Sequence, residues 1–390
     1  MENQSTLLSL RELKRKEAQK RYRAVGVAMF VIAAGLLIVR TVSVIIGSIV
    51  YAGEVKDELL VDTVFELVFS VLVQIVILLT VTFLIYKIAL KMKPREVLEF
   101  SNFRKTKWFN IALSIPLGIL ALFVTIGVST FWVVVVTTLG YNNSGSATVL
   151  PDVFNPGLFI LQLTLTALLP GICEEFAVRG GFFTTMNKSY RGRTFYFIMA
   201  IAFGLFHQNI MQVFYTALFG AVMAFVLVKT KSIFPCIIIH FFNNATSVYL
   251  DYAEAYRWPG GEIMNTIFSG IMENFGVVFF TFLVILAAFI GLLVLLHHLN
   301  PSEKRPVTQQ ARPGFSHSGW ADYLRQNTEA KRSPYPYAVP NESIATPVAI
   351  PEPPVEERYK PSLRDNAFYI GAIVITALFT VFSFVWGWFY

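Results

Sequence analysis

The sequence has few charged residues for its length. Of its 390 residues, 32 are Lys or Arg and 25 are Asp or Glu, so 15% are charged while 55% are apolar. Soluble globular chains carry about a quarter of charged residues, and disordered chains have few apolar ones. The shortage of charge therefore excludes a disordered chain, a collagen and a simple nucleic-acid-binding protein, and it predicts a polytopic membrane protein.

The sequence also lacks the marks of several other classes of protein. Its only cysteines, Cys173 and Cys236, lie in apolar stretches, which excludes a disulfide framework and a zinc ribbon. There is no internal repeat and no glycine-rich phosphate loop. The first apolar run follows a basic segment and is too long for a secretory signal peptide.

Apolar runs recur along the whole chain. A helix that crosses a bilayer needs about 20 apolar residues, and about nine runs reach or approach this length. They cover residues 24–52, 66–88, 109–139, 157–178, 194–208, 211–229, 231–250, 275–298 and 366–390. The fifth and seventh runs are the weakest, because each contains a histidine. The expected fold is an all-α, polytopic transmembrane helical bundle.

Lys and Arg residues are concentrated in alternate connections between these runs, and cytosolic loops carry the excess of such residues. The pattern places residues 1–23 in the cytosol and predicts nine crossings. Residues 299–365 are rich in proline and carry charges of both signs, so we expect a disordered cytosolic linker there. A proline-rich docking segment is the alternative for the same stretch.

The predicted organisation follows from these boundaries. The parts are a basic N-terminus (1–23), the first transmembrane helices (24–139), the helices with the candidate site (157–250), an eighth-helix region (251–298), the linker (299–365) and the last helix (366–390). Residues 91–107 resemble a basic, partly amphipathic segment at the membrane surface. The net charge of +7 then reflects topology and does not indicate an acidic substrate.

Ionisable residues inside a span are costly and are candidates for function. We discount five of them, because each can reach the membrane surface from a helix end or from a long, tilted helix. These residues are Arg40, Glu66, Glu273, His297 and His298.

Three other ionisable residues are harder to discount. Glu174, His207 and His240 lie on separate predicted helices, about 18, 20 and 14 Å from the predicted cytosolic ends of those helices, and therefore at similar depths. Asn244 lies one helical turn after His240 and faces the same way. A buried polar cluster that only fixes helix packing is the structural alternative.

These residue types suit the hydrolysis of an amide by water, which needs a base for the water and donors for the oxyanion. A desolvated carboxylate such as Glu174 can act as the base while a nearby imidazole holds the water. His240 and the Asn244 amide can donate to the oxyanion. Glu175 and Arg179 are four residues apart, which suits an ion pair that offsets a buried charge.

Two other mechanisms would use the same part of the chain. Glu174, His207 and His240 could ligate zinc with an open position, although the sequence has no HExxH pair and asparagine is a poor zinc ligand. Cys236 lies one turn before His240, so a Cys–His dyad is a further option. The residues favour metal-free hydrolysis by a small margin.

The same residues form three motifs in a recognisable order. Residues 174–180 (EEFAVRG) fit EExxxR(G), residues 203–207 (FGLFH) fit FxxxH and residues 240–244 (HFFNN) fit HxxxN. Their order and spacing resemble the CPBP family of CAAX proteases and bacteriocin-processing enzymes, also called the type II CAAX prenyl endopeptidase or Abi family. The resemblance covers residues 157–250, and residues 203–209 look like the bacterial members of that family.

The resemblance implies an intramembrane endopeptidase with a helical core. By analogy with the family, Glu174 would activate water together with His207, while His240 and Asn244 would form the oxyanion hole. Glu175 and Arg179 would support the site in the same analogy. No cofactor is expected, with a zinc-dependent protease as the alternative.

The resemblance also implies partners and a location. The expected partners are membrane lipid and a hydrophobic or lipidated peptide or protein substrate, and no nucleic acid is expected. The expected location is a bacterial cell membrane, with the protein as a multi-pass membrane protein. The competing functions are a proton-coupled transporter and a non-catalytic scaffold or immunity protein. The absence of an inverted repeat and of paired broken helices argues against the transporter.

Overall fold

The structure is a computed structural model that describes residues 2–53, 57–141, 150–301 and 359–386. The chain divides into two compact units, Met1–Gln19 with Ser302–Lys360 and Lys20–Pro301 with Pro361–Tyr390. The second unit contains all the described helices except the first part of α1. No strand occurs within the described ranges, so the predicted all-α fold is confirmed.

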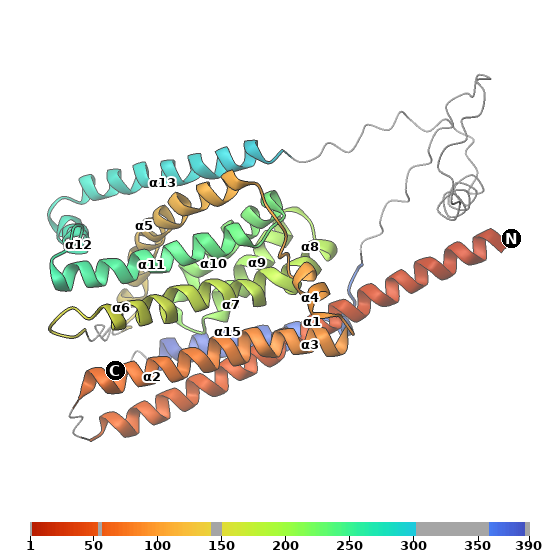
Figure 1. Cartoon of the computed structure of the whole chain (residues 1–390), viewed down its shortest axis with the longest axis horizontal. Helices are drawn as coiled ribbons and strands as arrows, with labels where there is room; N and C mark the ends of the chain where they lie inside the picture. Colours follow the sequence, from red (N-terminus) through yellow and green to blue (C-terminus); the bar gives the residue numbers. More distant parts are fainter. Residues whose placement is uncertain (1, 54–56, 142–149, 302–358, 387–390) are drawn as a thin grey trace. The chain divides into compact units, whose positions relative to one another are not determined.

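Helices make up most of the described chain (Figure 1). Their bounds, in chain order, are α1 (Glu2–Tyr51), α2 (Glu58–Ser70), the π-helical η1 (Val71–Val81), α3 (Thr82–Ala89), α4 (Pro94–Phe100), α5 (Trp108–Thr138), α6 (Pro156–Gln162), the π-helical η2 (Leu163–Leu168), α7 (Leu169–Ala177), the π-helical η3 (Val178–Phe182), α8 (Phe183–Ser189), α9 (Gly192–Phe206), α10 (Ile210–Thr230), α11 (Phe234–Tyr256), α12 (Ile263–Glu273), α13 (Phe275–Leu299) and α15 (Leu363–Trp386).

Seven helical segments in the described part of the chain are long and apolar enough to cross a membrane. They are Glu12–Tyr51, Glu58–Ala89, Trp108–Thr138, Pro156–Ser189, Ile210–Thr230, Phe275–Leu299 and Leu363–Trp386. The two weakest predicted spans are helical as well, but α9 has only 15 residues. The polar residues His240, Asn243 and Asn244 lower the hydropathy of α11. The count of nine crossings and the cytosolic N-terminus stay predictions.

The outer faces of these helices are strongly apolar. Large side chains such as Ile38, Val64, Phe280 and Leu378 are exposed. Exposed apolar surface on this scale marks a protein that contacts lipid or other proteins. Together with the seven apolar helices, it makes this chain a multi-pass membrane protein.

Small residues allow the central helices to approach closely. A Cβ atom added to Gly204 on α9 would lie 2.7 Å from the Val213 carbonyl oxygen on α10. One added to Gly118 on α5 would lie 2.7 Å from the Ile239 oxygen on α11. Glycine at such contacts is the usual means of close helix packing in membranes. These contacts bring α9, α10, α11 and α5 together around the candidate site.

The last described helix, α15, packs against α1 (Figure 1). The Tyr22 and Tyr369 rings meet edge to face, with centroids 4.9 Å apart, and Arg23 Nε lies 2.7 Å from Asp365 Oδ1. At its other end, Ser383 Oγ accepts a hydrogen bond of 2.9 Å from the Ile210 amide at the start of α10. The predicted helix at 366–390 is therefore present over its described residues. Most of the predicted linker, residues 302–358, lies outside the described residues.

Candidate active site

Glu174 lies on the short helix α7 and is the centre of the candidate site. Its side chain is 12% exposed, and its Oε1 accepts a hydrogen bond of 3.0 Å from Gln74 Nε2 on η1. Glu174 Oε2 lies 3.9 Å from His207 Nε2 and 4.0 Å from His240 Nε2. The structure thus brings together the three residues that the sequence placed at similar depths on separate helices.

His207 occupies the C-cap of α9. Its Nδ1 lies 2.9 Å from the Phe203 carbonyl oxygen, which can only accept a hydrogen bond. Nδ1 therefore carries a proton, and in the neutral form of the ring Nε2, which lies 3.9 Å from Glu174 Oε2, is an acceptor. Phe203, the first residue of the FxxxH motif, sets the orientation of the histidine that ends it.

His240 on α11 is held by the second glutamate of the EExxxR motif. Its Nδ1 lies 2.9 Å from Glu175 Oε1, and the same oxygen lies 3.0 Å from Arg179 Nη1. The Glu175 and Arg179 side chains are completely buried, so each needs an opposite charge or a polar partner. The Arg179 guanidinium also lies 3.8 Å from the centre of the Phe203 ring, a cation–π contact.

The helix bends immediately after Arg179. Gly180 has φ −77° and ψ −121°, which is not helical, and a Cβ on Gly181 would lie 2.5 Å from Phe100 and 2.6 Å from Tyr86. Asn102 Nδ2 donates to the Arg179 carbonyl oxygen at 3.0 Å. Ser101 is buried and Phe100 and Asn102 are half-buried against this bend, whereas most of the other residues of 91–107 are exposed, and the position of this segment at the membrane surface stays a prediction.

Asn244 lies beside the site, but its amide is already engaged. Its Nδ2 donates to the Thr166 carbonyl oxygen at 2.9 Å, and its Oδ1 accepts from Asn243 Nδ2 at 2.9 Å. One of its two amide hydrogens is thus used by η2. Its predicted role as an oxyanion donor stays a prediction.

The contacts of Cys236 and the spacing of possible metal ligands bear on the two other candidate mechanisms, a Cys–His dyad and a zinc site. Cys236 Sγ donates to the Met223 carbonyl oxygen at 3.5 Å, so it does not form a dyad with His240. Among the described residues, no group of three or more His, Cys, Asp or Glu side chains is spaced to hold a metal ion. Zinc-dependent hydrolysis and cofactor-free hydrolysis both stay untested predictions, and we derive no step through a metal.

Two of the discounted residues form hydrogen bonds with other helices of the bundle. Glu66 Oε1 accepts hydrogen bonds from Thr166 Oγ1 at 3.1 Å and from Gln162 Nε2 at 3.5 Å, so Glu66 faces the neighbouring helix. Arg40 Nη1 donates to the His207 carbonyl oxygen at 2.7 Å. These contacts were not foreseen, because hydropathy does not tell which way a side chain points, and the expectation that both side chains reach the membrane surface stays a prediction. Glu273, His297 and His298 are exposed, as expected.

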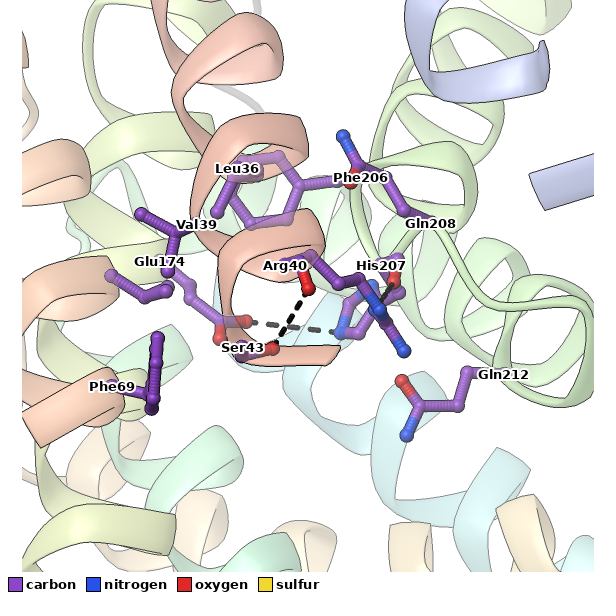
Figure 2. Close-up of a pocket in the computed structure, with 11 residues that line it drawn as sticks. Leu36, Val39, Arg40, Ser43, Phe69, Glu174, Phe206, His207, Gln208 and Gln212 are labelled. Carbon is purple, nitrogen blue, oxygen red and sulfur yellow. Dashed lines mark hydrogen bonds and ion pairs between the residues drawn. The ribbon is translucent and has the colours of Figure 1, made fainter. Parts of the chain in front are cut away.

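A cavity of about 360 Å³ opens on one side of Glu174 (Figure 2). It lies between α1, the α2–η1 helix, α7 and the stretch from Phe206 to Gln212. Its walls are Leu36, Val39, Arg40, Ser43, Phe69, Val73, Glu174, Phe206, His207, Gln208 and Gln212. About half of the lining is polar or charged, so the cavity can hold a ligand with both apolar and polar parts.

Sequence reasoning missed Gln74 altogether. This residue is buried and bonds directly to Glu174. An amide within the apolar run 66–88 was the signal that could have identified it, because polar side chains in a span usually face the bundle interior.

Comparison with known proteins gives one match. Residues 156–246 match a family model described as "Type II CAAX prenyl endopeptidase Rce1-like", whereas no curated protein and no solved structure matches the chain. The matched segment contains all three motifs and Glu174, His207 and His240. The resemblance to the CPBP family is thereby confirmed for this segment. Residues 156–246 are thus similar to the CPBP family of CAAX protease-like proteins, and the match does not extend to the helices on either side.

Proposed function

We propose that this protein is an intramembrane endopeptidase in which Glu174 activates water to hydrolyse a peptide bond. The observation that carries the proposal is the arrangement around Glu174 Oε2. Two imidazole Nε2 atoms lie 3.9 and 4.0 Å away, and this oxygen has no hydrogen-bond partner within the described part of the chain. These separations are too long for direct hydrogen bonds and match a gap bridged by one water or one substrate atom.

Glu174 and His207 are suited to hold the water. A water between them donates one hydrogen to Glu174 Oε2 and the other to His207 Nε2, because both atoms are acceptors. This leaves a lone pair of the water oxygen free to attack the carbonyl carbon. Glu174 takes the proton as the C–O bond forms and passes it to the nitrogen of the leaving amine as the C–N bond breaks.

His240 is suited to stabilise the oxyanion, but only in its doubly protonated form. Its Nδ1 donates to Glu175 Oε1, so Nε2 can donate only when the ring is an imidazolium. Glu175 Oε1 also lies 3.0 Å from Arg179 Nη1, so Arg179 balances the charge of Glu175. The second amide hydrogen of Asn244 supplies the other donor in this proposal.

The substrate class follows from the setting of the site. The cavity lies among apolar helices, and the family description names a prenyl endopeptidase. We therefore propose an apolar or lipidated peptide as the substrate. A bacterial cell membrane, expected from residues 203–209, is part of the same proposal.

The test is comparative peptidomics of membranes that contain the wild type or Glu174→Gln. The substitution keeps the shape of the side chain and removes the base, so cleavage should fall by about 10²- to 10⁴-fold and an uncut peptide should accumulate. Glu273→Gln is the matched control, because Glu273 is exposed at the end of α12. Unchanged peptide patterns in a folded Glu174→Gln variant would exclude the proposed function.

A further inference from the structure

Arg40 is a cation in the middle of an apolar helix, and its side chain faces the cavity. It lies 16 residues after Ala24, or about 24 Å along the helix axis. A charged side chain at such a depth is costly and is retained where it faces a polar cavity or a ligand. Arg40 lines the same cavity as Glu174.

The contacts of Arg40 leave most of its donors available. A guanidinium has five N–H donors, and Nη1 donates to the His207 carbonyl oxygen at 2.7 Å. Glu174 is the one carboxylate that lines the cavity, and its partners are Gln74, His207 and His240. Across the described ranges, no carboxylate forms an ion pair with Arg40, although the Glu174 carboxylate lines another part of the same cavity.

The neighbours of Arg40 complete a site for an anion. Gln212 and Arg40 line the same cavity as Glu174, and in the view of Figure 2 the ends of the Gln212 and Arg40 side chains lie on one side and Glu174 on the other. An amide N–H and a guanidinium fork together suit the two oxygens of a carboxylate. Because Arg40 also bonds to the backbone of His207, this anion site and the candidate reaction centre share one residue.

The size of the cavity limits how far a bound anion can lie from the reacting bond. A volume of about 360 Å³ is at the lower end of the range for small-molecule sites, so it accommodates a short stretch of peptide. A carboxylate bound at Arg40 would therefore place a peptide bond only a few residues away beside Glu174.

We propose that Arg40, assisted by Gln212, binds a carboxylate of the substrate close to the bond that is cleaved. The proposal rests on the proposed function and defines the substrate more closely, as an apolar peptide with a negative charge near the cleavage point. The carboxylate can belong to the free C-terminus of the substrate or to an Asp or Glu side chain, and the probes below separate these sources.

Binding is measured on full-length Glu174→Gln protein in nanodiscs of zwitterionic lipid, so the result does not depend on turnover. The first probe pair is N-acetyl-Leu-Val-Leu as the free acid and as the carboxamide. The second pair is N-acetyl-Leu-Glu-Leu carboxamide and its Gln counterpart. In at least one pair the acid should bind about tenfold tighter than its neutral partner. The pair that shows the preference identifies the source of the carboxylate.

Substitution of Arg40 should remove that preference. In an Arg40→Gln background the ratio of acid to neutral affinity should fall to about one, because the variant keeps a donor for the His207 carbonyl oxygen but loses the charge. Arg40→Lys should keep part of the ratio, because the charge remains while the fork is lost. Since each ratio is measured within one variant, a loss of folded protein does not change it.

Two results would overturn the proposal. One is equal affinity for acid and neutral probes, whether tight or undetectable. The other is a preference for the acid that survives Arg40→Gln, which would leave Arg40 as a brace for His207. Either result leaves the proposed function intact as long as Glu174→Gln abolishes cleavage, so the two proposals can fail separately.

Discussion

The segment matched by the family model and the helices outside it contribute different things to the candidate site. Residues 156–246 provide Glu174, both histidines and the buried Glu175–Arg179 pair, and these residues are fixed by contacts with one another. The helices α1 and η1, which lie outside the match, provide Arg40 and Gln74 and much of the cavity wall. The matched segment thus holds the groups that we propose to react, whereas the flanking helices line much of the cavity beside them.

The largest effect is expected from a substitution in the buried Glu175–Arg179 pair of the matched segment. Arg179→Ala leaves Glu175 buried with one cationic partner fewer, and loss of one partner of a buried pair costs about 3–5 kcal/mol of stability. The free energy of unfolding, measured by denaturant titration in detergent, should fall by that amount.

Arg95→Ala is the matched control for Arg179→Ala. The Arg95 side chain is 90% exposed and its partner Glu99 is 56% exposed, so the same substitution should cost less than about 1 kcal/mol. Equal stability losses in the two variants would contradict the interpretation that Glu175 depends on Arg179.

A smaller effect is expected where the chain bends after Arg179. Gly181→Ala places a methyl group against Phe100 and Tyr86, and overpacking of this kind costs about 1–3 kcal/mol. The melting temperature of the variant should fall. Gly291→Ala on α13 is the control, because an added Cβ there meets nothing within 4 Å, and it should leave the melting temperature unchanged or slightly raised.

The flanking helix η1 should affect catalysis more than stability. Gln74→Leu keeps the bulk of the side chain and removes its hydrogen bond to Glu174 Oε1. Since a hydrogen bond to a charged group contributes about 1.5–3 kcal/mol, the cleavage rate should fall roughly tenfold or more as the orientation of Glu174 is lost. Kinetics on the substrate identified by peptidomics measure this effect, and wild-type kcat in the variant would refute a positioning role for Gln74.

The smallest effect is expected at the far end of α15. Ser383→Ala removes the hydrogen bond to the Ile210 amide, which contributes about 1 kcal/mol, so stability should fall slightly while turnover stays within a few-fold. Ser48→Ala is the control, because Ser48 Oγ donates only to its own helix at the Val44 carbonyl oxygen. If Ser383→Ala lowered turnover as much as Gln74→Leu does, then η1, which contacts Glu174, and α15, which does not, would not differ in their effect on catalysis.

The convergence of Glu174, His207 and His240 could be predicted from the sequence, because helical rise converts sequence position into depth. The side-chain directions of Arg40 and Glu66 could not, because a long helix presents residues on every side and only packing decides which side faces a cavity. The bend at Gly180 was equally hidden, since the residues that pack against Gly180 and Gly181, among them Ser101 and Tyr86, are distant in sequence. The hydrogen bond from Asn244 to the Thr166 carbonyl oxygen was hidden for the same reason, because it joins residues that are distant in sequence.

The contact between α1 and α15 has a consequence for the order in which the protein is assembled. Arg23 and Tyr22 pair with Asp365 and Asn366, and α15 is synthesised after every other described helix. The first helix, which carries one wall of the cavity, therefore receives this brace only when translation has passed residue 386. A nascent chain that already carries all three motifs but not yet α15 therefore lacks these contacts to α1, so the wall of the cavity that α1 provides is held less firmly at that stage.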